Sequence, residues 1–474
     1  MSFHKTSNRS RKLYDRPPDM KVLLFNPPGK HIFSRDYFCS KVTKSGYCEH
    51  PVDLLILSGT LASEHNVSLL DAIVRGLGEE EVEREIDSIG PDVIIFLSGS
   101  SSFSEDFHLM ARLKIKRPDT LLVGIGDIFR ETSIIEKLDW LDAILLDFTT
   151  DDILHFLQKR YSGIRNMVYR QEGKIAACLP SETSRWYSIP IPQHHIFLGS
   201  PYHFPFARYH PYATVLTDFG CPHHCLFCIY GDLKFKQRPV TNVVDELHYL
   251  RKMSIREIFF KDQAFAEDRE RALKLCSAME EMGEFSWCCF MRVDSVDEIL
   301  LRTMKRAGCH TIMFGVESSN EEILRRFQKK TIKTQIRHAF ELCHAIGIKT
   351  LGTFILGFPG EDRSSCLDTI RFALELNCTY ASFNIFMPKH ATLLRDELLG
   401  ENKLSEESPL DQSGILPFHS YANISSKSLL RLKKRAIASF YFRFSYMFRQ
   451  LFGIKTLFEL KMLFIRAFYL FFRQ

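Results

Sequence analysis

Three cysteines stand close together in the middle of the chain, in the order Cys221-Pro-His-His-Cys225-Leu-Phe-Cys228. They follow an apolar run that predicts a strand, so a loop there could wrap around a metal centre. Three thiolates at this spacing can each bind a different iron of a [4Fe–4S] cluster and leave the fourth iron without a protein ligand. Structural zinc needs four ligands, and His223 or His224 could complete a zinc site instead. The spacing alone therefore leaves an iron–sulfur cluster and zinc as alternatives.

The rest of the composition favours an intracellular protein with two or three domains. The chain has 474 residues, 13 cysteines and a net charge of +5, which is too mild to predict nucleic-acid binding. Cys276, Cys309, Cys343 and Cys366 lie in apolar patterns, which predicts buried thiols rather than disulfides. Residues 1–20 form a polar tail without the apolar core of a signal peptide, and no run of about 18 apolar residues predicts a membrane span. We therefore expect a cytoplasmic protein.

Short apolar runs alternate with helical patterns over residues 21–160. This alternation predicts a parallel, doubly wound α/β domain. Ligands of such sheets bind beyond the carboxyl ends of the strands. Here those ends are the loops that begin at Asn26, Asp71, Ser98 and Gly124.

Three further regions follow along the chain. Residues 161–205 read as irregular and contain several prolines, which predicts a linker. Residues 206–400 contain six more apolar runs separated by helical patterns, which predicts a partial (β/α)6 barrel whose site lies at the carboxyl ends of its strands. Residues 401–474 predict a basic, aromatic and helical C-terminal region.

The cysteine segment resembles the signature of the radical S-adenosylmethionine (SAM) superfamily, in which an aromatic residue, here Phe227, precedes the last cysteine. The resemblance extends over roughly residues 210–390. It includes FFKDQAF with Asp262, FGVES with Glu317, and GFPGE with Gly357 and Pro359. It implies that Asp262 or its neighbours approach the SAM amino group, that Glu317 binds the ribose hydroxyls, and that GFPGE lies near the adenine and methionine. A carboxylate suits a vicinal diol because it accepts two hydrogen bonds.

The resemblance also implies the chemistry. The three cysteines would hold a [4Fe–4S] cluster whose open iron is chelated by SAM, and electron transfer would cleave SAM to methionine and a 5′-deoxyadenosyl radical. Each motif also has a structural alternative, because Asp262 could cap a helix, Glu317 could form a salt bridge at the barrel rim, and GFPG could be a plain turn.

A doubly wound domain ahead of such a barrel resembles the cobalamin-binding class of the superfamily, with matches at VLLFNPPG, PDVII and LLVGIGD. The resemblance implies cobalamin near Asn26, Asp71, Ser98, Gly124 and Gly126. The chain departs from the class at GIGD, where GG followed by His is common, and at the position of a "GEGE"-like segment. A domain that kept the fold and lost the cofactor is the alternative.

Cobalamin proteins that ligate cobalt through histidine use a DxHxxG loop after the first strand, and this chain lacks one. Asp106-Phe-His108 falls in a helical pattern and has Ala111 where glycine belongs, so His108 is expected to be an ordinary helix residue. We expect any bound cobalt to have no histidine ligand from the protein.

Residues 427–474 are rich in Lys, Arg, Phe and Tyr and contain one acidic residue, Glu459. One reading is an interfacial region that contacts the inner membrane face or a lipid-like substrate. The other is a helical cap on the barrel with its cations turned outward. Nucleic-acid binding is not expected, because the aromatic residues follow a buried pattern.

The leading hypothesis is a cobalamin-dependent radical SAM methyltransferase that acts on an unactivated carbon of a small molecule such as a lipid or tetrapyrrole. Its electron donor would be a flavodoxin or ferredoxin. One alternative is an oxidative cyclase like the anaerobic Mg-protoporphyrin monomethyl ester cyclase, and another is a non-catalytic iron–sulfur redox or binding protein. Methylthiotransferases carry three further N-terminal cysteines, whereas this chain has Cys39 and Cys48 there.

Overall fold

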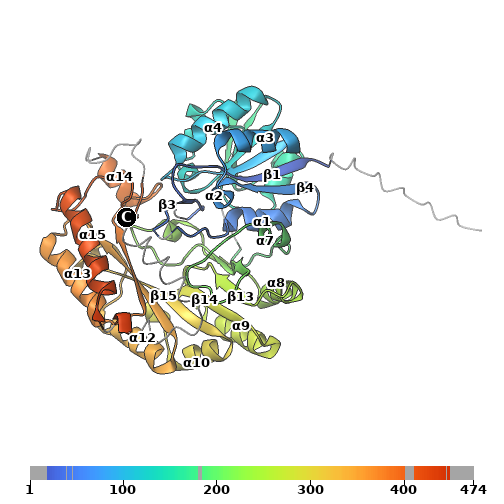
Figure 1. The fold of residues 1–474 in the computed structure, drawn as a ribbon. Helices are drawn as coiled ribbons and strands as arrows, with labels where there is room; N and C mark the ends of the chain where they lie inside the picture. The colour runs from blue at the N-terminus through green and yellow to red at the C-terminus, as the bar shows by residue number, and fades with distance from the viewer. Residues whose placement is uncertain are drawn as a thin grey trace, which may run out of the picture.

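The computed structural model describes residues 19–448, except 39, 45, 180–183, 401–409 and 445. Two sheets, each accompanied by helices, lie next to each other (Figure 1). The first belongs to the N-terminal unit and the second to the barrel. One hydrophobic cluster contains residues of both, such as Leu24 and Leu57 with Phe259 and Met313, so the two units share a packed interface.

The first sheet has seven strands in the order β4-β1-β5-β6-β7-β8-β9. They are β1 (Lys21–Asn26), β4 (Asn66–Asp71), β5 (Val93–Leu97), β6 (Leu121–Ile125), β7 (Ala143–Leu145), β8 (Met167–Gln171) and β9 (Lys174–Cys178). The first five in this order pair in parallel. All residues of β5 are buried, as expected for a parallel strand with both faces covered.

Helices cover both faces of this sheet. They are α1 (Val52–Leu61), α2 (Ala72–Arg75), α3 (Glu79–Ile89), α4 (Phe103–Lys116), α5 (Ile134–Lys137) and α6 (Asp152–Leu157), with 3₁₀ turns η1 (Asp127–Arg130) and η2 (Tyr161–Gly163). Successive side chains of a strand point to opposite faces. Accordingly Leu24 of β1 packs in the cluster of α1 and α6, and Leu23 packs in the cluster of α3 and α4. This arrangement confirms the predicted doubly wound fold.

The region expected to be an irregular linker, residues 161–205, is partly built into the first sheet. β8 and β9 pair antiparallel with β7 and with each other, and the short helix α7 (His195–Leu198) follows. The hairpin turns at Glu172 and Gly173, whose φ angles are 49° and 75°. Two left-handed residues in succession suit a tight hairpin turn. The expectation of a linker is therefore wrong for these two strands.

A long connection joins β1 to α1, and we call residues 27–50 the inter-domain loop. It contains a small antiparallel pair, β2 (Phe33–Ser34) with β3 (Lys41–Val42). It begins at the carboxyl end of β1, and Lys44 donates from it to the Phe383 carbonyl of the second sheet at 2.6 Å. The loop therefore bridges the two sheets.

The second sheet has six parallel strands that follow sequence order, with β10 and β17 at its edges. They are β10 (Tyr212–Val215), β13 (Glu257–Phe260), β14 (Ser286–Met291), β15 (Cys309–Glu317), β16 (Lys349–Leu356) and β17 (Tyr380–Ile385). A two-stranded pair, β11 (Asp218–Phe219) with β12 (Lys236–Gln237), follows β10. The six strands confirm the predicted partial (β/α)6 barrel.

The helices of this unit lie along the outside of the sheet (Figure 1). They are α8 (Val240–Lys252), α9 (Arg269–Met282), α10 (Glu298–Arg306), α11 (Glu321–Arg326), α12 (Lys333–Ile346) and α13 (Arg363–Glu375), with turns η3 (Ile229–Asp232) and η4 (Val293–Ser295) elsewhere in the unit. A further helix, α14 (Leu393–Gly400), follows β17 and packs Leu394 and Leu398 against Phe358 and Phe386. Cys276, Cys309, Cys343 and Cys366 are all buried and free, as predicted.

The C-terminal helix α15 (Ser426–Tyr441) packs its apolar side against the barrel. Leu429, Leu432 and Phe440 are buried there. For this helix the structure favours the cap on the barrel, whereas residues 449–474 of the basic tail lie outside the described residues. No helix in the described part of the chain is long and apolar enough to cross a membrane.

Candidate active site

The three clustered cysteines lie in the loop between β11 and η3, beyond the carboxyl end of β10. Cys225 is buried, and Cys221 and Cys228 are partly exposed. Backbone hydrogen bonds shape the loop: the Cys221 N–H donates to the Tyr230 carbonyl at 3.1 Å, and the Cys228 N–H donates to the Cys225 carbonyl at 2.9 Å. The loop thus presents three thiols from one short, fixed turn.

Two cations accompany the cysteines. Arg292 follows β14 and Lys329 follows α11, and both side chains are buried. Burial raises the pKa of Cys221 to about 11, the charge of Cys225 adds to this, and Arg292 opposes it. Burial likewise raises the pKa of Cys228, and Lys329 opposes that shift. A positive centre is therefore needed to hold these groups as thiolates.

The spacing of the thiols separates the two metal alternatives. Among the described residues, one set of three potential ligands has its ligand atoms within 4.8 Å of one another, and this set is Glu257, Cys288 and His310 rather than the cysteine triad. Cysteines on one zinc ion have their sulfurs about 3.8 Å apart, because each Zn–S bond is about 2.3 Å long. The wider triad fits a cluster, in which each thiolate binds a different iron.

Glu317 ends β15 at a break in the sheet register. Its φ angle is 67°, which is uncommon for a residue with a side chain. Burial raises the pKa of its carboxyl group, whereas the nearby cations Lys329 and Arg292 lower it. The carboxylate oxygen lies 3.9 Å from the Lys329 ammonium, so Glu317 shares its cationic neighbours with the cysteine loop. The structure thus brings this predicted residue to the cysteines.

The GFPGE turn also meets the cysteine loop. The ring of Phe227, between two cysteines, packs edge-on against Phe358 with the centroids 5.4 Å apart. The backbone N–H groups of Gly357 and Phe358 donate to one carboxylate oxygen of Glu361, at 2.9 and 3.0 Å. The Pro359 carbonyl accepts from Arg326 at 3.2 Å. Glu361 therefore fixes the turn on which the predicted SAM residues Gly357 and Pro359 lie.

Asp262 lies just after β13, at the turn that precedes the cysteine loop. Its carboxylate is fully buried and accepts from the Thr217 N–H at 2.6 Å, the Thr217 hydroxyl at 2.7 Å and the Asp218 N–H at 2.9 Å. Both oxygens are thus occupied within the protein. The residue fixes the turn ahead of the cysteine loop, and the approach of Asp262 or its neighbours to the SAM amino group stays a prediction.

The predicted cobalamin residues gather at the carboxyl edge of the first sheet, but the protein itself occupies most of their polar atoms. Asn26 donates to Asp71 at 3.0 Å, and Asp71 also accepts from the Tyr202 hydroxyl at 2.8 Å. The Ser98 hydroxyl donates to Asp106 at 2.8 Å. These side chains therefore stabilise the carboxyl edge of the sheet through hydrogen bonds within the protein.

The two predicted glycines are required by packing at the same edge. A Cβ atom on Gly124 would lie 2.4 Å from the Phe129 ring. One on Gly126, whose φ is 132°, would lie 1.9 Å from the Ser98 carbonyl oxygen. His108 is an exposed residue of α4, as predicted.

Sequence reasoning missed the residue that organises this edge, Arg35 of the inter-domain loop. Its guanidinium pairs with Asp106 at 2.6 Å and donates to the Asn26 side chain at 3.1 Å. A single arginine in a loop carries no pattern that would reveal this role. Arg292 was also missed, although a cation directly after a barrel strand is a signal that could have found it.

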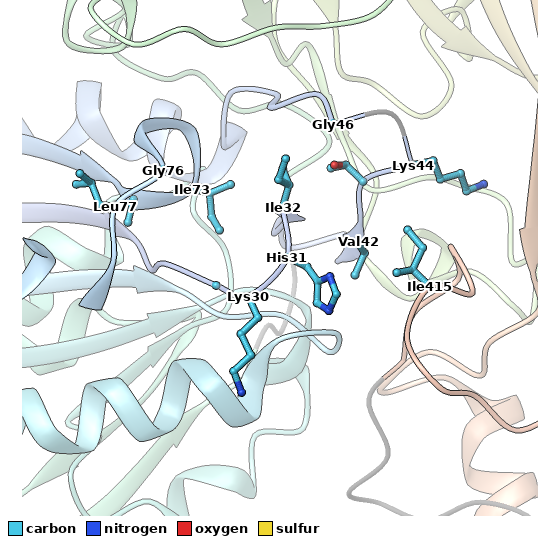
Figure 2. Close-up of a pocket in the computed structure, with 13 residues that line it drawn as sticks. Lys30, His31, Ile32, Val42, Lys44, Gly46, Ile73, Gly76, Leu77 and Ile415 are labelled. Carbon is cyan, nitrogen blue, oxygen red and sulfur yellow. The ribbon is translucent and has the colours of Figure 1, made fainter. Parts of the chain in front are cut away.

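The carboxyl edge retains features that suit a ligand. The hydroxyls of Thr43, Ser100 and Ser101 are buried and have no hydrogen-bond partner among the described residues. A cavity of about 280 Å³ lies at the loops that follow β1 and β4, and His31 and Lys30 line it (Figure 2). Figure 2 shows the His31 ring between the loop after β1 and the side chains of Val42 and Ile415. Of these three residues Thr43 lines the cavity, so one unpartnered donor is available there to a polar group of a ligand.

The edge lies against the cysteine loop. Phe38 of the inter-domain loop stacks on Tyr230, two residues after Cys228, with the ring centroids 4.6 Å apart. Lys236 of β12 pairs with Asp147 after β7 at 2.5 Å. The two predicted cofactor regions therefore face each other across one interface.

The comparisons with known proteins agree with this architecture. The model of the radical SAM superfamily matches residues 216–373. An uncharacterized methyltransferase of Pyrococcus horikoshii is 28% identical, with the match covering 90% of this chain and 93% of the relative.

Two solved structures share the fold. OxsB, a cobalamin-dependent SAM radical enzyme solved with aqua-cobalamin and SAM, has a TM-score of 0.67 and 15% identity, covering 95% of this chain and 72% of its own. The radical SAM methyltransferase TsrM from Kitasatospora setae, solved with cobalamin and a [4Fe–4S] cluster, has a TM-score of 0.64 and 17% identity, covering 81% of this chain and 75% of its own. At these identities the likeness is one of fold.

The six-stranded barrel with its triad of cysteines at the strand ends defines a radical SAM enzyme. With its doubly wound N-terminal unit, the whole chain is similar in fold to cobalamin-dependent radical SAM enzymes.

Proposed function

We propose that this protein is a cobalamin-dependent radical SAM methyltransferase that methylates an unactivated carbon of a small molecule. The observation that carries the proposal is the contact between the carboxyl edge of the first sheet and the cysteine loop, through Phe38 and Tyr230. That contact places a cobalamin-type domain against a cluster-type loop, and the solved relatives OxsB and TsrM hold their cofactors in the same fold.

Each cofactor has candidate residues in this chain. Cys221, Cys225 and Cys228 would hold a [4Fe–4S] cluster, Glu317 would bind the SAM ribose, and the edge with Ser100 would receive cobalamin. When bound, these groups supply a 5′-deoxyadenosyl radical and a methyl group.

The chain's own side chains support such chemistry in two ways. The buried cations Arg292 and Lys329 offset the negative charge of thiolates and of a reduced cluster. The rings of Phe227, Phe327 and Phe358 pack together beside the cysteines and limit the access of water. We propose further that a flavodoxin or ferredoxin supplies the electron, because SAM cleavage consumes one from outside the protein.

The first experiment tests the cluster. Protein purified without oxygen should contain about four irons and four sulfides per chain. Cys225→Ala should lose the cluster and SAM cleavage. The matched control Cys343→Ala, which removes a buried thiol from α12, should keep both. A wild-type protein that binds one zinc and no iron after anaerobic reconstitution would refute the proposal.

The second experiment separates methyl transfer from ring formation. A methyltransferase consumes two SAM molecules per product, so 5′-deoxyadenosine and S-adenosylhomocysteine should appear together with the true substrate or a close analogue. An oxidative cyclase would give 5′-deoxyadenosine without stoichiometric S-adenosylhomocysteine. Failure to bind cobalamin under anaerobic reconstitution would reject both activities in their present form.

The third experiment examines the cobalt. The chain has no DxHxxG loop, so the Co(II) protein should show no strong nitrogen hyperfine splitting from an axial imidazole in its electron paramagnetic resonance spectrum. His31, which lines the cavity at the carboxyl edge, is the histidine to vary. If splitting is observed and His31→Ala removes it, the expectation of a histidine-free cobalt is wrong.

A further inference from the structure

A second group of potential metal ligands lies at the opposite end of the barrel from the cysteines. It consists of Glu257, the first residue of β13, Cys288 in the first half of β14, and His310 near the start of β15. These three strands are neighbours in the sheet (Figure 1). His310 and Glu317 are seven residues apart on β15, which corresponds to about 20 Å along a strand. The group is thus separate from the proposed SAM site.

The three side chains converge on one point. Their ligand atoms all lie within 4.8 Å of one another, and His310 Nε2 is hydrogen-bonded to Glu257 Oε1 at 2.8 Å, a bond that an ion between the two would replace. All three residues are at most 1% exposed. The second carboxylate oxygen of Glu257 is buried without a hydrogen-bond partner, so a coordination position on it remains free.

The surroundings orient the histidine as a metal site requires. His310 Nδ1 lies 2.8 Å from the Thr311 hydroxyl, which leaves Nε2 as the nitrogen that faces Glu257 and Cys288. Second hydrogen bonds of this kind fix the ring and the tautomer of metal-binding histidines.

Charge balance also favours a cation. In the salt bridges of the described residues Glu257 pairs with His310, and Arg208 and Lys349 act on the group from a greater distance. A divalent ion would balance one carboxylate and one thiolate, and its binding would release the thiol proton.

We propose that Glu257, Cys288 and His310 bind one Zn²⁺ ion at the amino end of the barrel, with water in the fourth position. One sulfur, one nitrogen and one oxygen donor form a ligand set that zinc accepts, whereas Mg²⁺ and Ca²⁺ prefer oxygen ligands alone. The ion would join three adjacent strands at the end of the barrel remote from the radical chemistry. The inference is independent of the proposed function.

The test uses the full-length protein with its iron–sulfur cluster reconstituted. After removal of loosely bound metal with a chelator, elemental analysis should find about one zinc per chain beside the iron. Zinc K-edge X-ray absorption, which iron does not obscure, should show one sulfur at about 2.3 Å and nitrogen or oxygen at about 2.0 Å. This measurement on the wild-type protein decides the proposal even if the variants fold poorly.

Variants then assign the ligands. Cys288→Ala and His310→Gln should lose the zinc and keep the iron, whereas Cys289→Ala, which removes the next buried thiol on the opposite face of β14, should keep both. Absence of zinc from the wild type, or full zinc retention in Cys288→Ala, overturns the proposal. A shell of three or four sulfurs also overturns it, because it places zinc on Cys221, Cys225 and Cys228. The accompanying loss of iron would mark that outcome as a failure of the proposed cluster.

Discussion

Glu317 combines three properties that point to a ligand-binding role: a left-handed backbone, a position at a sheet irregularity and a buried carboxylate beside cations. Backbone strain of this kind costs about 1–3 kcal/mol and persists where the surroundings impose it. The cysteine loop and Lys329 provide such surroundings. The same carboxylate forms a salt bridge with Lys329, so the rim salt bridge anticipated as a structural alternative is present alongside the proposed role.

Glu317→Gln should retain the cluster and weaken SAM binding about 10- to 100-fold, because hydrogen bonds to a charged acceptor contribute about 1.5–3 kcal/mol. The affinity is measured anaerobically by equilibrium binding, with iron content as the check on folding. Glu322→Gln, an exposed carboxylate in the first turn of α11, is the control and should bind SAM normally. Unchanged affinity for SAM in Glu317→Gln would mean that Glu317 has only a structural role, through its salt bridge with Lys329.

Glu361 supports a prediction about pH. Burial raises its pKa to about 7, although the N–H groups of Phe358 and Gly357 partly offset this. A raised carboxyl pKa stabilises the folded state most below the unfolded value near 4.3, and this contribution is lost as the pH rises through about 7. Glu361→Gln keeps an acceptor for the turn and cannot ionise. We expect its melting temperature to fall less than that of the wild type between pH 5 and pH 8.

Calorimetry of both proteins across this range measures the difference. Glu375 is exposed at the end of α13, so Glu375→Gln is a matched control. Its melting temperature should change with pH as that of the wild type does. Parallel curves for Glu361→Gln and the wild type would show that the Glu361 carboxyl does not titrate in this range.

At the scale of elements, the cysteine loop depends on the segment that follows α11. The Leu226 N–H donates to the Phe327 carbonyl at 3.1 Å, and the Cys225 thiol lies 3.8 Å from the Gln328 carbonyl. Arg292 donates to the Lys329 carbonyl at 3.1 Å and thereby holds the same segment. The segment therefore sets both the position of the thiols and the charge around them.

Lys329→Gln should make the cluster harder to reduce, because a buried positive charge beside the thiolates favours the more negative reduced state. We expect the potential to fall on the order of tens of millivolts. An anaerobic redox titration followed by electron paramagnetic resonance measures it. Lys330→Gln, which removes the exposed neighbouring charge, should shift the potential much less because solvent screens that charge. Equal shifts in both variants would contradict a local effect of Lys329.

The sequence predicted those elements whose pattern is local. All six barrel strands were expected, because each is an apolar run bounded by turn residues. The hairpin of β8 and β9 was missed, although alternating apolar residues around Glu172-Gly173 carried a hairpin signal. The roles of Asp262 and Arg35 could not be predicted, because they depend on contacts with Thr217 and Asp106 that only the folded chain creates.

At the scale of the whole molecule, buried ion pairs join the two units. The Lys261 ammonium, just after β13, lies 2.5 Å from Glu49 and 3.4 Å from Asp36 of the inter-domain loop. All three side chains are at most 9% exposed. Burial opposes ionisation of Glu49, but Lys261 and Lys41 outweigh it and lower its pKa. One lysine between two carboxylates thus contributes to the interface, beside Lys236–Asp147 and the shared hydrophobic cluster.

Lys261→Met should destabilise the protein by about 3–5 kcal/mol at neutral pH, because removing one partner leaves buried charges without compensation. In a chain of this size such a loss lowers the melting temperature by about 3–5 °C. In the wild type, the Lys261–Glu49 pair loses its stabilising contribution as the pH falls through the lowered pKa of Glu49. In the variant, protonation of the carboxylates at low pH removes the charge that the missing lysine left uncompensated. The difference in stability between the two proteins should therefore shrink from pH 7 toward pH 4.

Calorimetry measures the melting temperatures of both proteins across this pH range. Lys252 is exposed at the end of α8, so Lys252→Met is the control and should melt like the wild type. A difference of the same size at both pH values would mean that Lys261 acts through packing rather than through its charge.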